Sequence, residues 1–504
     1  MSFESEGDRA AKQALSEGRS ALVWQRQIAD TDTPISAALK LFEPDRGDFL
    51  LESVEGGAVR GRHSLIGLAP DLVFRAMGNR AEINRQWQTD REAFAPTDLG
   101  TLASLRALVE ECKADMDAAL PSALACLVGY FGYETIGLVE KLRRPTANPI
   151  DVPDILFVRP TLILVFDRLA DALFLVAPVW NGSFTDPDKA IAAAHERIDA
   201  ASARIAGPIP KAAPAIDLSD VAVTPVLPQG RYEEMVLKAK DYIVAGDIFQ
   251  VVLAQRFTSP FTLPPIALYR ALRRINPSPF LYYLDLPGFA LIGSSPEILV
   301  RARDGEVTIR PIAGTRPRGR TATEDAANRE SLLADPKERA EHLMLLDLGR
   351  NDVGRVARAG TVTVTDSYGV EFYSHVMHVV SNVVGQIDSS KDALDALFAG
   401  FPAGTVSGAP KVRACEIIAE LEPESRGAYA GGVGYFSPNG NMDSCIVLRT
   451  AVLKDGVMHV QAGAGIVADS DPAYEQRECE AKSGALLAAA REAVAIARNA
   501  DFGQ

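Results

Sequence analysis

The sequence predicts an α+β fold with mainly antiparallel strands, and features of its second half carry that prediction. Residues 298–312, ILVRARDGEVTIRPI, form strand-like runs around Asp304-Gly305, a dipeptide typical of a hairpin turn. Three further strand segments follow one another across turn residues and predict an antiparallel meander; they cover residues 431–437, 444–453 and 457–467. Helical patterns lie between the strand segments, as expected for an α+β chain.

The first half of the chain also mixes strands and helices. Apolar runs bounded by turn residues predict strands at 72–77, 123–133 and 155–179, and a helical pattern covers 99–116. Residues 206–229 contain five prolines and few large apolar side chains, which predicts a linker or surface crossing. We therefore divide the chain into an N-terminal domain (1–205), the linker (206–229) and a C-terminal domain (230–504).

After the linker, residues 231–247 place apolar side chains on one helical stripe, and a strand should follow at 248–257. Residues 371–385 also have the pattern of a strand. Two histidines on that segment, His375 and His378, fall on opposite faces because side chains alternate along a strand. A histidine on a strand is more often a packed core or surface group than a catalyst, so only its neighbours can decide its role.

The overall composition is that of a globular protein, with 47% hydrophobic and 23% charged residues. A net charge of -14 argues against nucleic acid or an anionic membrane as the main partner. The N-terminus lacks the apolar core of a signal peptide, and charged residues interrupt the longest apolar region. Five widely spaced cysteines without a C-x-x-C pair indicate reduced thiols, and we expect a cytoplasmic protein.

Two predicted helices each carry a pair of acids. In DPKERAEHLMLLDLGRND (335–352), Glu338 and Glu341 lie three residues apart, and Glu475 and Glu478 repeat this spacing in 471–490. Carboxylates on facing helices suit Mg²⁺, with water and a substrate oxyanion completing the octahedron. Acids in a first helical turn also serve as caps and favour the helix dipole, and spacing alone favours that structural role.

Residues 404–411, GTVSGAPK, superficially suggest a phosphate-binding loop. Such a loop requires Lys directly after its second Gly, whereas Ala409 and Pro410 intervene here, so the segment does not predict a nucleotide site. The Gly-Ala-Gly run at 463–465 lets a ligand approach the backbone closely, although a tight bend explains it equally well.

Eight segments in order resemble the chorismate-utilising enzymes, and most of all the large subunits of anthranilate synthases. They are PIAGTRPRG (311–319), AEHLMLLDLGRNDVGRV (340–356), HVMHVVS (375–381), FPAGTVSGAPKVRACEII (401–418), RGAYAGGVGYF (426–436), DSCIVLRT (443–450), QAGAGIVADSDP (461–472) and the final E-x-x-E-x-x-x-K (475–482). Thinner similarity runs through 50–53, 62–67 and 128–134. The resemblance implies a large α/β sandwich of two mainly antiparallel sheets flanked by helices.

The resemblance also implies a Mg²⁺ cofactor that bridges protein acids to the ring carboxylate of chorismate. Glu341 and Glu478 match the direct metal ligands, while Glu338 and Glu475 match positions that assist through water or the second shell. Without a cation the acids would repel a dianionic substrate, whereas a bound metal ion makes the interaction attractive. By motif position the substrate contacts are Gly314, Thr315, Tyr429, Arg449, Gly463, Ala464, Gly465 and Lys482.

The implied reaction is attack of ammonia at ring C2 with loss of the C4 hydroxyl, followed by elimination of pyruvate. Glu297 matches the acid for the departing hydroxyl and needs a raised pKa for that role. His378 is the expected base for the C2 proton, with Thr315 beside it. Gln250 stands where water-adding relatives carry a lysine base, and Ala313 stands where the para-aminobenzoate branch carries a nucleophilic lysine. We therefore expect ortho-aminobenzoate, anthranilate, as the product. The alternatives are an enzyme of the para-aminobenzoate branch and a regulatory homologue that keeps the fold without the chemistry.

The implied partner is a separate glutamine amidotransferase subunit, because none of the five cysteines lies in a G-x-C-x-G elbow. We expect a heterotetramer and feedback inhibition by tryptophan. The expected tryptophan site comprises Glu52, Ser53, Asn276, Pro277, Pro279, Phe280 and Leu281. Asn382 replaces an arginine that is frequent in relatives, which leaves the strength of that inhibition open. The roles of Arg310, Arg316, Arg318 and Arg320 also remain open, between attracting a dianion and pairing with acids.

Overall fold

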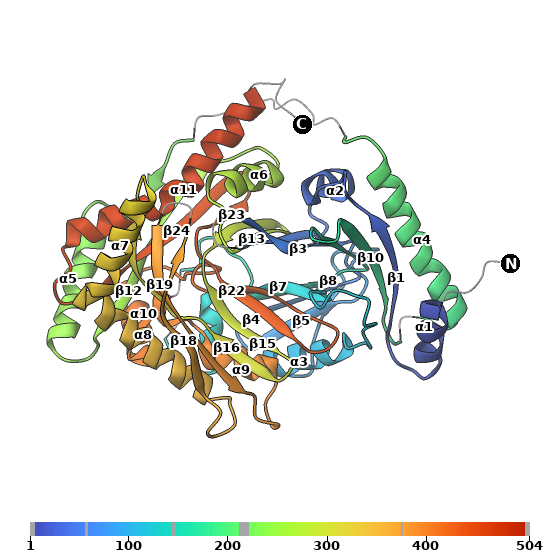
Figure 1. Ribbon diagram of the computed structural model, residues 1–504, viewed down its shortest axis with the longest axis horizontal. Coiled ribbons are helices and arrows are strands. Elements are labelled where there is room, and N and C mark those ends of the chain that lie inside the picture. The colour runs from blue at the N-terminus through green and yellow to red at the C-terminus, as the bar shows by residue number, and fades with distance from the viewer. Residues whose placement is uncertain are drawn as a thin grey trace.

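The computed structural model describes residues 6–55, 59–143, 145, 147–182, 184–210, 221–373 and 376–498. It contains two large sheets of mainly antiparallel strands with helices packed around them (Figure 1), which confirms the predicted fold class. We call them the first and the second sheet. No helix among the described residues is both long and apolar enough to cross a membrane.

The first sheet has twelve strands, with β20 pairing to β12 outside the main path. In spatial order it contains β1 (Ala21–Ile28), β10 (Ala172–Val179), β9 (Leu162–Asp167), β3 (Val59–Leu68), β2 (Phe49–Glu55), β13 (Phe280–Leu286), β14 (Phe289–Ser295), β23 (Thr450–Lys454), β24 (Val457–Ile466), β12 (Gln250–Pro260), β11 (Thr224–Pro225) and the side strand β20 (Gly408–Ala409).

The second sheet also has twelve strands, with β18 pairing to β19 outside the main path. In spatial order it contains β17 (Ile312–Pro317), β19 (Val376–Gln386), β16 (Glu306–Ile309), β15 (Ile298–Arg303), β22 (Met442–Ile446), β21 (Gly432–Phe436), β7 (Leu127–Phe131), β8 (Ile155–Arg159), β4 (Leu72–Met77), β5 (Arg80–Asn84), β6 (Phe94–Pro96) and the side strand β18 (Thr363–Phe372).

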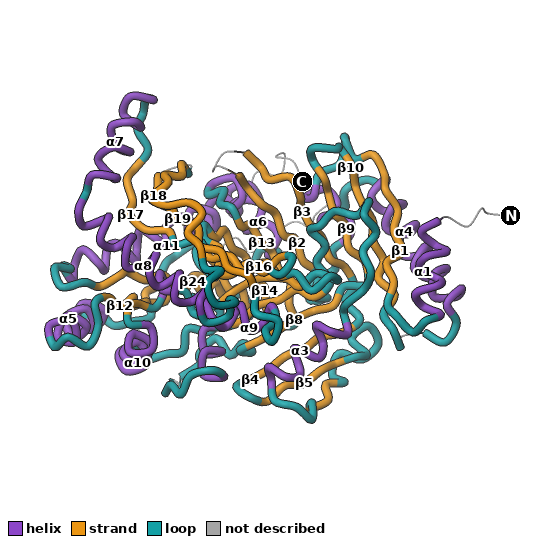
Figure 2. The backbone as a smooth tube through the Cα atoms, turned by 60° about the horizontal axis from the view of Figure 1, so that its bottom comes forward, coloured by secondary structure: helices purple, strands orange, loops and turns teal. Residues whose placement is uncertain are grey.

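Helices cover the sheets and connect their strands. They are α1 (Glu6–Ser16), α2 (Pro34–Leu41), α3 (Thr101–Glu111), α4 (Pro187–Ala206), α5 (Arg231–Val244), α6 (Pro265–Ile275), α7 (Ala322–Ala334), α8 (Pro336–Gly354), α9 (Ala393–Gly400), α10 (Lys411–Leu421) and α11 (Pro472–Arg498), with short 3-10 turns at Tyr133–Leu138 and Gly404–Val406. In Figure 2, α7 projects beyond the sheets near β17 and β18.

The first sheet is buried on both faces. Alternate residues of β2 belong to different core clusters: Phe49 faces the interior shared with the second sheet, whereas Leu50 faces the layer packed against α2, α4 and α6. Strands covered on both sides must be apolar at nearly every position, which explains the continuous apolar runs in 155–179. That segment forms β8, β9 and β10 as predicted.

The predicted meander is wrong in one respect. Residues 444–453 do not form one strand, because β22 ends at Ile446 in the second sheet and β23 begins at Thr450 in the first. The chain crosses between the sheets at residues 447–449, where Arg449 has a φ of 48°. Such a left-handed backbone interrupts a strand and turns the chain, and the apolar pattern on both sides conceals the break.

The prediction of a single strand at 371–385 is also wrong. β18 ends at Phe372 and β19 begins at Val376, and the two pair antiparallel with Phe372 opposite Met377. His375 lies outside the described residues, and His378 lies on β19. The predicted hairpin around Asp304-Gly305 is confirmed as β15 and β16.

Strands from both sides of residues 206–229 lie next to each other in each sheet. β2 pairs with β13 in the first sheet, and β7 pairs with β21 in the second. Within the predicted linker, Thr224 and Pro225 form β11 against β12, and residues 211–220 lie outside the described part of the chain. The division into 1–205, 206–229 and 230–504 stays a prediction.

Candidate active site

A cavity of about 1710 Å³ lies between the β12 and β24 region of the first sheet, β17 and β19 of the second sheet, and the helices α8 and α11. Figure 2 shows these elements gathered on one side of the molecule. The cavity brings together nearly all of the predicted catalytic, substrate and metal positions: Gln250, Glu297, Gly314, Thr315, Glu338, Glu341, His378, Tyr429, Arg449, Gly463, Gly465, Glu475, Glu478 and Lys482. Ala464 is the exception, because its side chain is fully buried in the hydrophobic core.

A β-bulge shapes the wall formed by β17. The pairing of β17 with β19 shifts register between Ala313 and Thr315, and Gly314 between them has a φ of 68°. A glycine in this left-handed conformation is a usual bulge residue. A Cβ at Gly314 would also lie 3.0 Å from Glu338 Oε2. The bulge therefore needs glycine, and it turns the Gly314 carbonyl toward His378.

The Gly314 carbonyl sets the tautomer of His378. His378 Nδ1 lies 3.0 Å from Gly314 O and 3.2 Å from Thr315 Oγ1. A carbonyl oxygen only accepts hydrogen bonds, so Nδ1 must carry the proton, which leaves Nε2 with a free lone pair in neutral histidine. Burial lowers the pKa of His378, an effect that the Gly314 bond partly opposes. The ring is therefore a neutral base at physiological pH.

Glu297 has the opposite electrostatic character. Its carboxyl group is buried, and Thr405 Oγ1 donates a hydrogen bond of 3.0 Å to its Oε1. Burial raises the pKa of Glu297 to about 8, although the Thr405 bond and Arg449 both lower it. A carboxyl group with this pKa is mostly protonated at neutral pH, so the cavity contains an acid as well as a base.

The acids on α8 are held by defined partners. Asp335 caps the helix, and Arg316 donates to Asp335 Oδ2 at 2.7 Å and to Glu338 Oε1 at 2.8 Å. Glu341 lies one turn further into the cavity wall. Its pKa is raised, first by burial and then by the nearby charge of Glu338. The side chain of Gln250 partly opposes this rise through a hydrogen bond.

The acids on α11 mirror this arrangement. Burial raises the pKa of Glu475, and the charge of Glu478 adds to the rise. Glu478 forms an ion pair of 2.6 Å with Lys482, whose Nζ also donates to Gly463 O at 3.0 Å. The acids repel each other within each pair, and Lys482 attracts Glu478. Carboxylates remain in excess at this end of the cavity, and a cation would balance their charge.

These acids fit a partial metal site rather than a closed one. Within the described residues, no three His, Cys, Asp or Glu side chains converge closely enough to enclose an ion. Mg²⁺ is commonly held by one or two protein carboxylates, with waters and substrate oxygens supplying the rest. Glu341 and Glu478, which line the same cavity from two helices, offer that donor chemistry.

Arg449 and Tyr429 add polar groups to the cavity wall. Arg449 lies at the crossing between the sheets, and burial lowers the pKa of its guanidinium group. The salt bridges among the described residues do not include it. The Tyr429 ring is buried, and its Oη lies where a Cβ on Gly463 would be only 2.8 Å away. The bare backbone of Gly463 therefore makes room for Tyr429.

The arginines near β17 pair with acids in the protein. Arg318 donates to both oxygens of Asp325 and to the Tyr373 carbonyl at 2.8 Å. Arg310 contacts Glu371, and the backbone of Arg320 donates to Glu324. Arg316, which holds the acids of α8, is the one among these four that lines the cavity.

The predicted tryptophan residues form a separate group along β2 and β13. Ser53 lies opposite Phe280 and Glu52 opposite Leu281 in the strand pair. The Glu52 carboxylate accepts hydrogen bonds from Tyr269 at 2.6 Å and Arg273 at 2.8 Å. None of the predicted tryptophan residues lines the cavity at α8 and α11. The predicted site residues therefore lie in two distinct regions, the cavity at α8 and α11 and the group near β2 and β13.

Several functional contacts are absent from the sequence-based prediction. Thr405, which holds Glu297, belongs to the FPAGTVSGAPK segment, where only the approach to a helix was predicted. The only sequence signal for its role is a hydroxyl residue placed among glycine-rich neighbours. The buried pair Arg426 and Glu422 behind Tyr429 was also missed, because the spacing of two charges cannot show that both are buried.

Comparisons with known proteins show which family the chain belongs to. Residues 56–488 match the chorismate binding enzyme family. The chain is 52% identical to "Anthranilate synthase component 1" of Cereibacter sphaeroides over 491 residues, which covers 96% of this chain and 97% of that protein. It is 46% identical to the protein of the same name from Pseudomonas putida, covering 92% of this chain and 93% of that protein.

Solved structures give the same result. The crystal structure of anthranilate synthase component I from Streptococcus pneumoniae matches with a TM-score of 0.76 and 35% identity, covering 92% of this chain and 99% of that one. The menaquinone-specific isochorismate synthase of Escherichia coli matches with a TM-score of 0.69 at 20% identity, covering 96% of this chain and 100% of that one, which supports the fold alone. The chain therefore belongs to the chorismate binding enzyme family.

Proposed function

We propose that this chain is the large subunit of an anthranilate synthase, a lyase that converts chorismate and ammonia to anthranilate, pyruvate and water. The observation that carries this proposal is the pairing, in one cavity, of a protonated acid at Glu297 with a neutral base at His378. The similarity to proteins named anthranilate synthase component 1 supports the same activity.

The cavity offers complementary groups for a substrate with two carboxylates. Arg449 can bind one carboxylate with a two-pronged hydrogen bond, and Tyr429 and the Gly463 backbone lie nearby. Gly314 and Thr315 line the opposite wall. Mg²⁺, when bound by Glu341 and Glu478, would supply positive charge for the second carboxylate. Glu338 and Glu475 would then orient water around these acids.

The acid and the base act in successive steps. Ammonia attacks ring C2, the ring double bonds shift, and the C4 hydroxyl leaves as water after taking a proton from Glu297. The ammonium group loses a proton to solvent. His378 Nε2 then removes the hydrogen from C2 while the enolpyruvyl C–O bond breaks, and the departing enolpyruvate becomes pyruvate on protonation. The ring becomes aromatic and keeps its amino group ortho to the carboxylate.

Two positions favour the ortho product over the para isomer. Ala313 has no nucleophilic atom, so the wall of β17 cannot form a covalent bond to the ring. Gln250 lines the cavity where a base for water would be needed, and an amide is not such a base. Ammonia itself is then the attacking group.

We also propose a partner and a regulator. A glutamine amidotransferase subunit would supply ammonia in a cytoplasmic heterotetramer, and tryptophan would bind at Glu52, Ser53 and residues 276–281. The Asn276 side chain supports the second proposal, because its Nδ2 is buried without a hydrogen-bond partner among the described residues. A ligand carboxylate or carbonyl could accept that hydrogen.

The activity is tested by product identity. Purified protein is incubated with chorismate, Mg²⁺ and an ammonium salt, and the products are separated by chromatography and identified by mass and fluorescence. We expect ortho-aminobenzoate and pyruvate in equal amounts, and no reaction with glutamine unless an amidotransferase subunit is added. Formation of para-aminobenzoate, isochorismate or no product would reject the proposal.

A further inference from the structure

A buried ion pair lies directly behind the cavity wall. Glu422 directly follows α10 as its C-cap, and Arg426 lies four residues later; their side chains are 6% and 2% exposed. Arg426 Nε donates to Glu422 Oε2 at 2.9 Å, and its second terminal nitrogen donates to Oε1 at 2.6 Å. Burial lowers the pKa of Arg426, but Glu422 more than offsets this effect, so that the net pKa lies above the ordinary value. Arg426 therefore keeps its positive charge.

Arg426 also bonds to the backbone of two cavity walls. Its guanidinium group donates to Val252 O on β12 and to Val406 O in the turn before β20, both at 2.7 Å. Val252 and Val406 line the cavity themselves. The Val406 turn contains Thr405, the residue that donates to Glu297.

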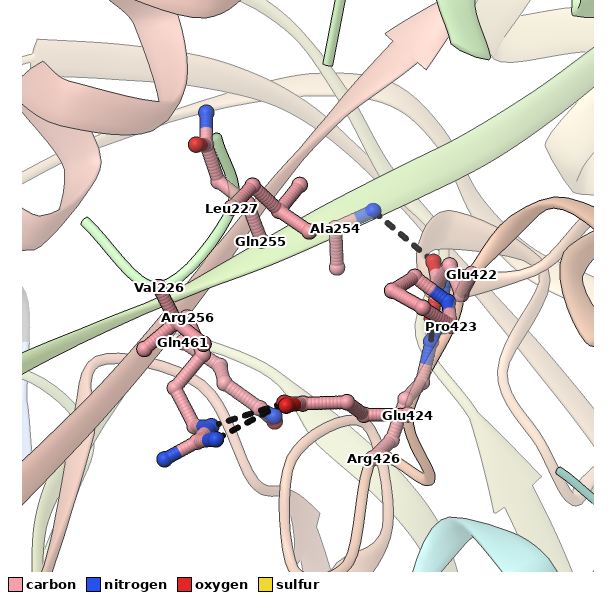
Figure 3. Close-up of a pocket in the computed structure, with 10 residues that line it drawn as sticks. All are labelled: Val226, Leu227, Ala254, Gln255, Arg256, Glu422, Pro423, Glu424, Arg426 and Gln461. Atoms are coloured by element: carbon pink, nitrogen blue, oxygen red, sulfur yellow. Dashed lines mark hydrogen bonds and ion pairs between the residues drawn. The ribbon is translucent and has the colours of Figure 1, made fainter. Parts of the chain in front are cut away.

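A third wall rests against the same side chain. The guanidinium carbon lies 5.5 Å from the centre of the Tyr429 ring and 4.6 Å from that of Tyr133. Glu422 makes a second connection to β12, because its Oε1 accepts a hydrogen bond of 2.8 Å from Ala254 N. Figure 3 shows Glu422 reaching Ala254 in the crevice behind the cavity.

A second ion pair in the same crevice lacks these connections. Arg256 donates to Glu424 Oε2 at 3.1 Å and 2.8 Å, and Figure 3 shows this pair beside Gln461. Its remaining terminal nitrogen contacts His459 at 3.0 Å. Both pairs join β12 or its neighbourhood to the segment after α10, but among the described residues the Arg256 side chain donates no hydrogen bond to a residue that lines the cavity.

We propose that Arg426 is a positioning residue, oriented by Glu422. It fixes three parts of the cavity wall relative to one another: Val252 on β12, the 404–406 turn whose Thr405 donates to Glu297, and the ring of Tyr429. This inference rests on the proposed function for its effect on turnover. A guanidinium group makes all these bonds at once because its donors are planar and diverge, whereas the single ammonium group of lysine cannot. Arg426→Lys should therefore keep the charge but loosen the walls.

The test compares R426K with R256K, its matched control, by steady-state kinetics with chorismate, Mg²⁺ and ammonium. Thermal unfolding and near-ultraviolet circular dichroism show whether each variant is folded. We expect R426K to lower kcat about 30-fold to 100-fold with a smaller change in KM, because a displacement of about 1 Å in the reacting groups costs about that much. R256K should keep kcat within about twofold.

A structural readout makes the test independent of activity. In the crystal structure of R426K we expect the Tyr429 ring and the 404–406 turn to move by more than about 0.5 Å, the tolerance of a positioned site. If R426K does not fold, the double variant R426M/E422Q replaces it, since removing both charges avoids a lone buried ion. It should fold and show the same loss of kcat.

The outcomes separate the two proposals. Unmoved walls in R426K, or a kcat as high as that of R256K, would overturn the positioning role. An equal loss of kcat in both lysine variants would also overturn it, since that would indicate general loosening of the crevice. An inactive wild-type protein would instead reject the proposed function, and the wall positions in R426K would still decide the structural claim.

Discussion

Glu297 is buried and His378 is half-buried, and loss of water contact shifts the pKa values of the two groups in opposite directions. A carboxyl group is charged when deprotonated, so burial raises the pKa of Glu297 to about 8. An imidazole is charged when protonated, so burial lowers the pKa of His378. Both groups are thus mostly neutral near pH 7, which leaves one able to give a proton and the other able to take one.

This assignment predicts the alkaline side of the pH profile. Glu297 must be protonated to act, so kcat should fall as pH rises through about 8. Glu297→Gln should lower kcat about 10²-fold to 10⁴-fold and remove that fall. Thr405→Val removes a bond that lowers the pKa of Glu297, so the fall should move to higher pH. A pH series of initial rates on the three proteins measures this, and an unmoved fall in T405V would contradict it.

At the residue scale, the sequence predicted which residues line the cavity better than it predicted their contacts. Its resemblance to a family singled out Glu297 and His378, and both line the cavity. It could not predict that Gly314 O sets the histidine tautomer, because that depends on a bulge between paired strands. The partners of Arg316 and Arg318 were equally hidden, since ion pairs form across segments that come together only in the fold.

The helices α8 and α11 present their acids to one cavity, which the spacing of the acids alone could not predict. Each helix begins at an Asp-Pro pair, and each carries its first acid three residues before the second. The start of each helix followed from the sequence because caps and first-turn prolines are local signals. Their common orientation depends on how α8 packs on β17 and β19 and how α11 packs on β24, which is tertiary information.

Replacing one acid on α8 should abolish turnover without unfolding the protein. Glu341→Gln removes a charge that would hold the cation, and we expect kcat/KM to fall about 10³-fold, because a bound cation contributes several kcal/mol. Asp347→Asn is the matched control, since Asp347 lies on the same helix with 73% of its side chain exposed. Initial rates over a Mg²⁺ titration measure both variants. Normal Mg²⁺-dependent rates in E341Q would refute the metal role.

The strand pair β2 and β13 carries the proposed tryptophan site. Ser53→Ala removes one hydroxyl group, and a neutral hydrogen bond contributes about 1 kcal/mol, so the inhibition constant for tryptophan should rise about fivefold. The uninhibited kcat should stay within about twofold, because Ser53 does not line the cavity. Ser259→Ala, a buried serine on β12, is the control. Unchanged inhibition in S53A would remove Ser53 from the site.

Errors at the element scale have a common cause. The crossing at 447–449 and the hairpin between β18 and β19 both interrupt apolar runs that look continuous in the sequence. Periodicity reports that each residue is buried, but it does not report which sheet buries it. The Asp304-Gly305 hairpin was predicted correctly because the turn residues themselves carry the signal.

At the scale of the whole molecule, the two parts of the chain complete each other's sheets. Residues before the linker supply β2 and β7, and residues after it supply their neighbours β13 and β21. The largest hydrophobic cluster likewise contains Phe157 from the first part and Phe436 from the second, whose rings lie 5.9 Å apart. Long-range pairing of this kind was not predictable from a proline-rich segment, which only suggested a boundary.

We expect neither part to fold alone. Without residues 1–205, β13 and β21 would become exposed edges with apolar faces, which favours aggregation. Fragments 1–205 and 230–504 should each lack a cooperative thermal transition, whereas co-expression should restore one soluble complex. Circular dichroism melts and size-exclusion chromatography measure this. A cooperatively folded 230–504 fragment would show that the second part is an independent domain.

The most direct test of the account is the position of the metal. Crystals of the full chain grown with Mn²⁺ and chorismate, without ammonium, would locate the ion by anomalous scattering. We expect one anomalous peak between the carboxylates of Glu341 and Glu478, in contact with a carboxylate of chorismate whose other carboxylate meets Arg449. Chorismate bound in the cavity with no ion beside these acids, or an ion elsewhere, would contradict the account.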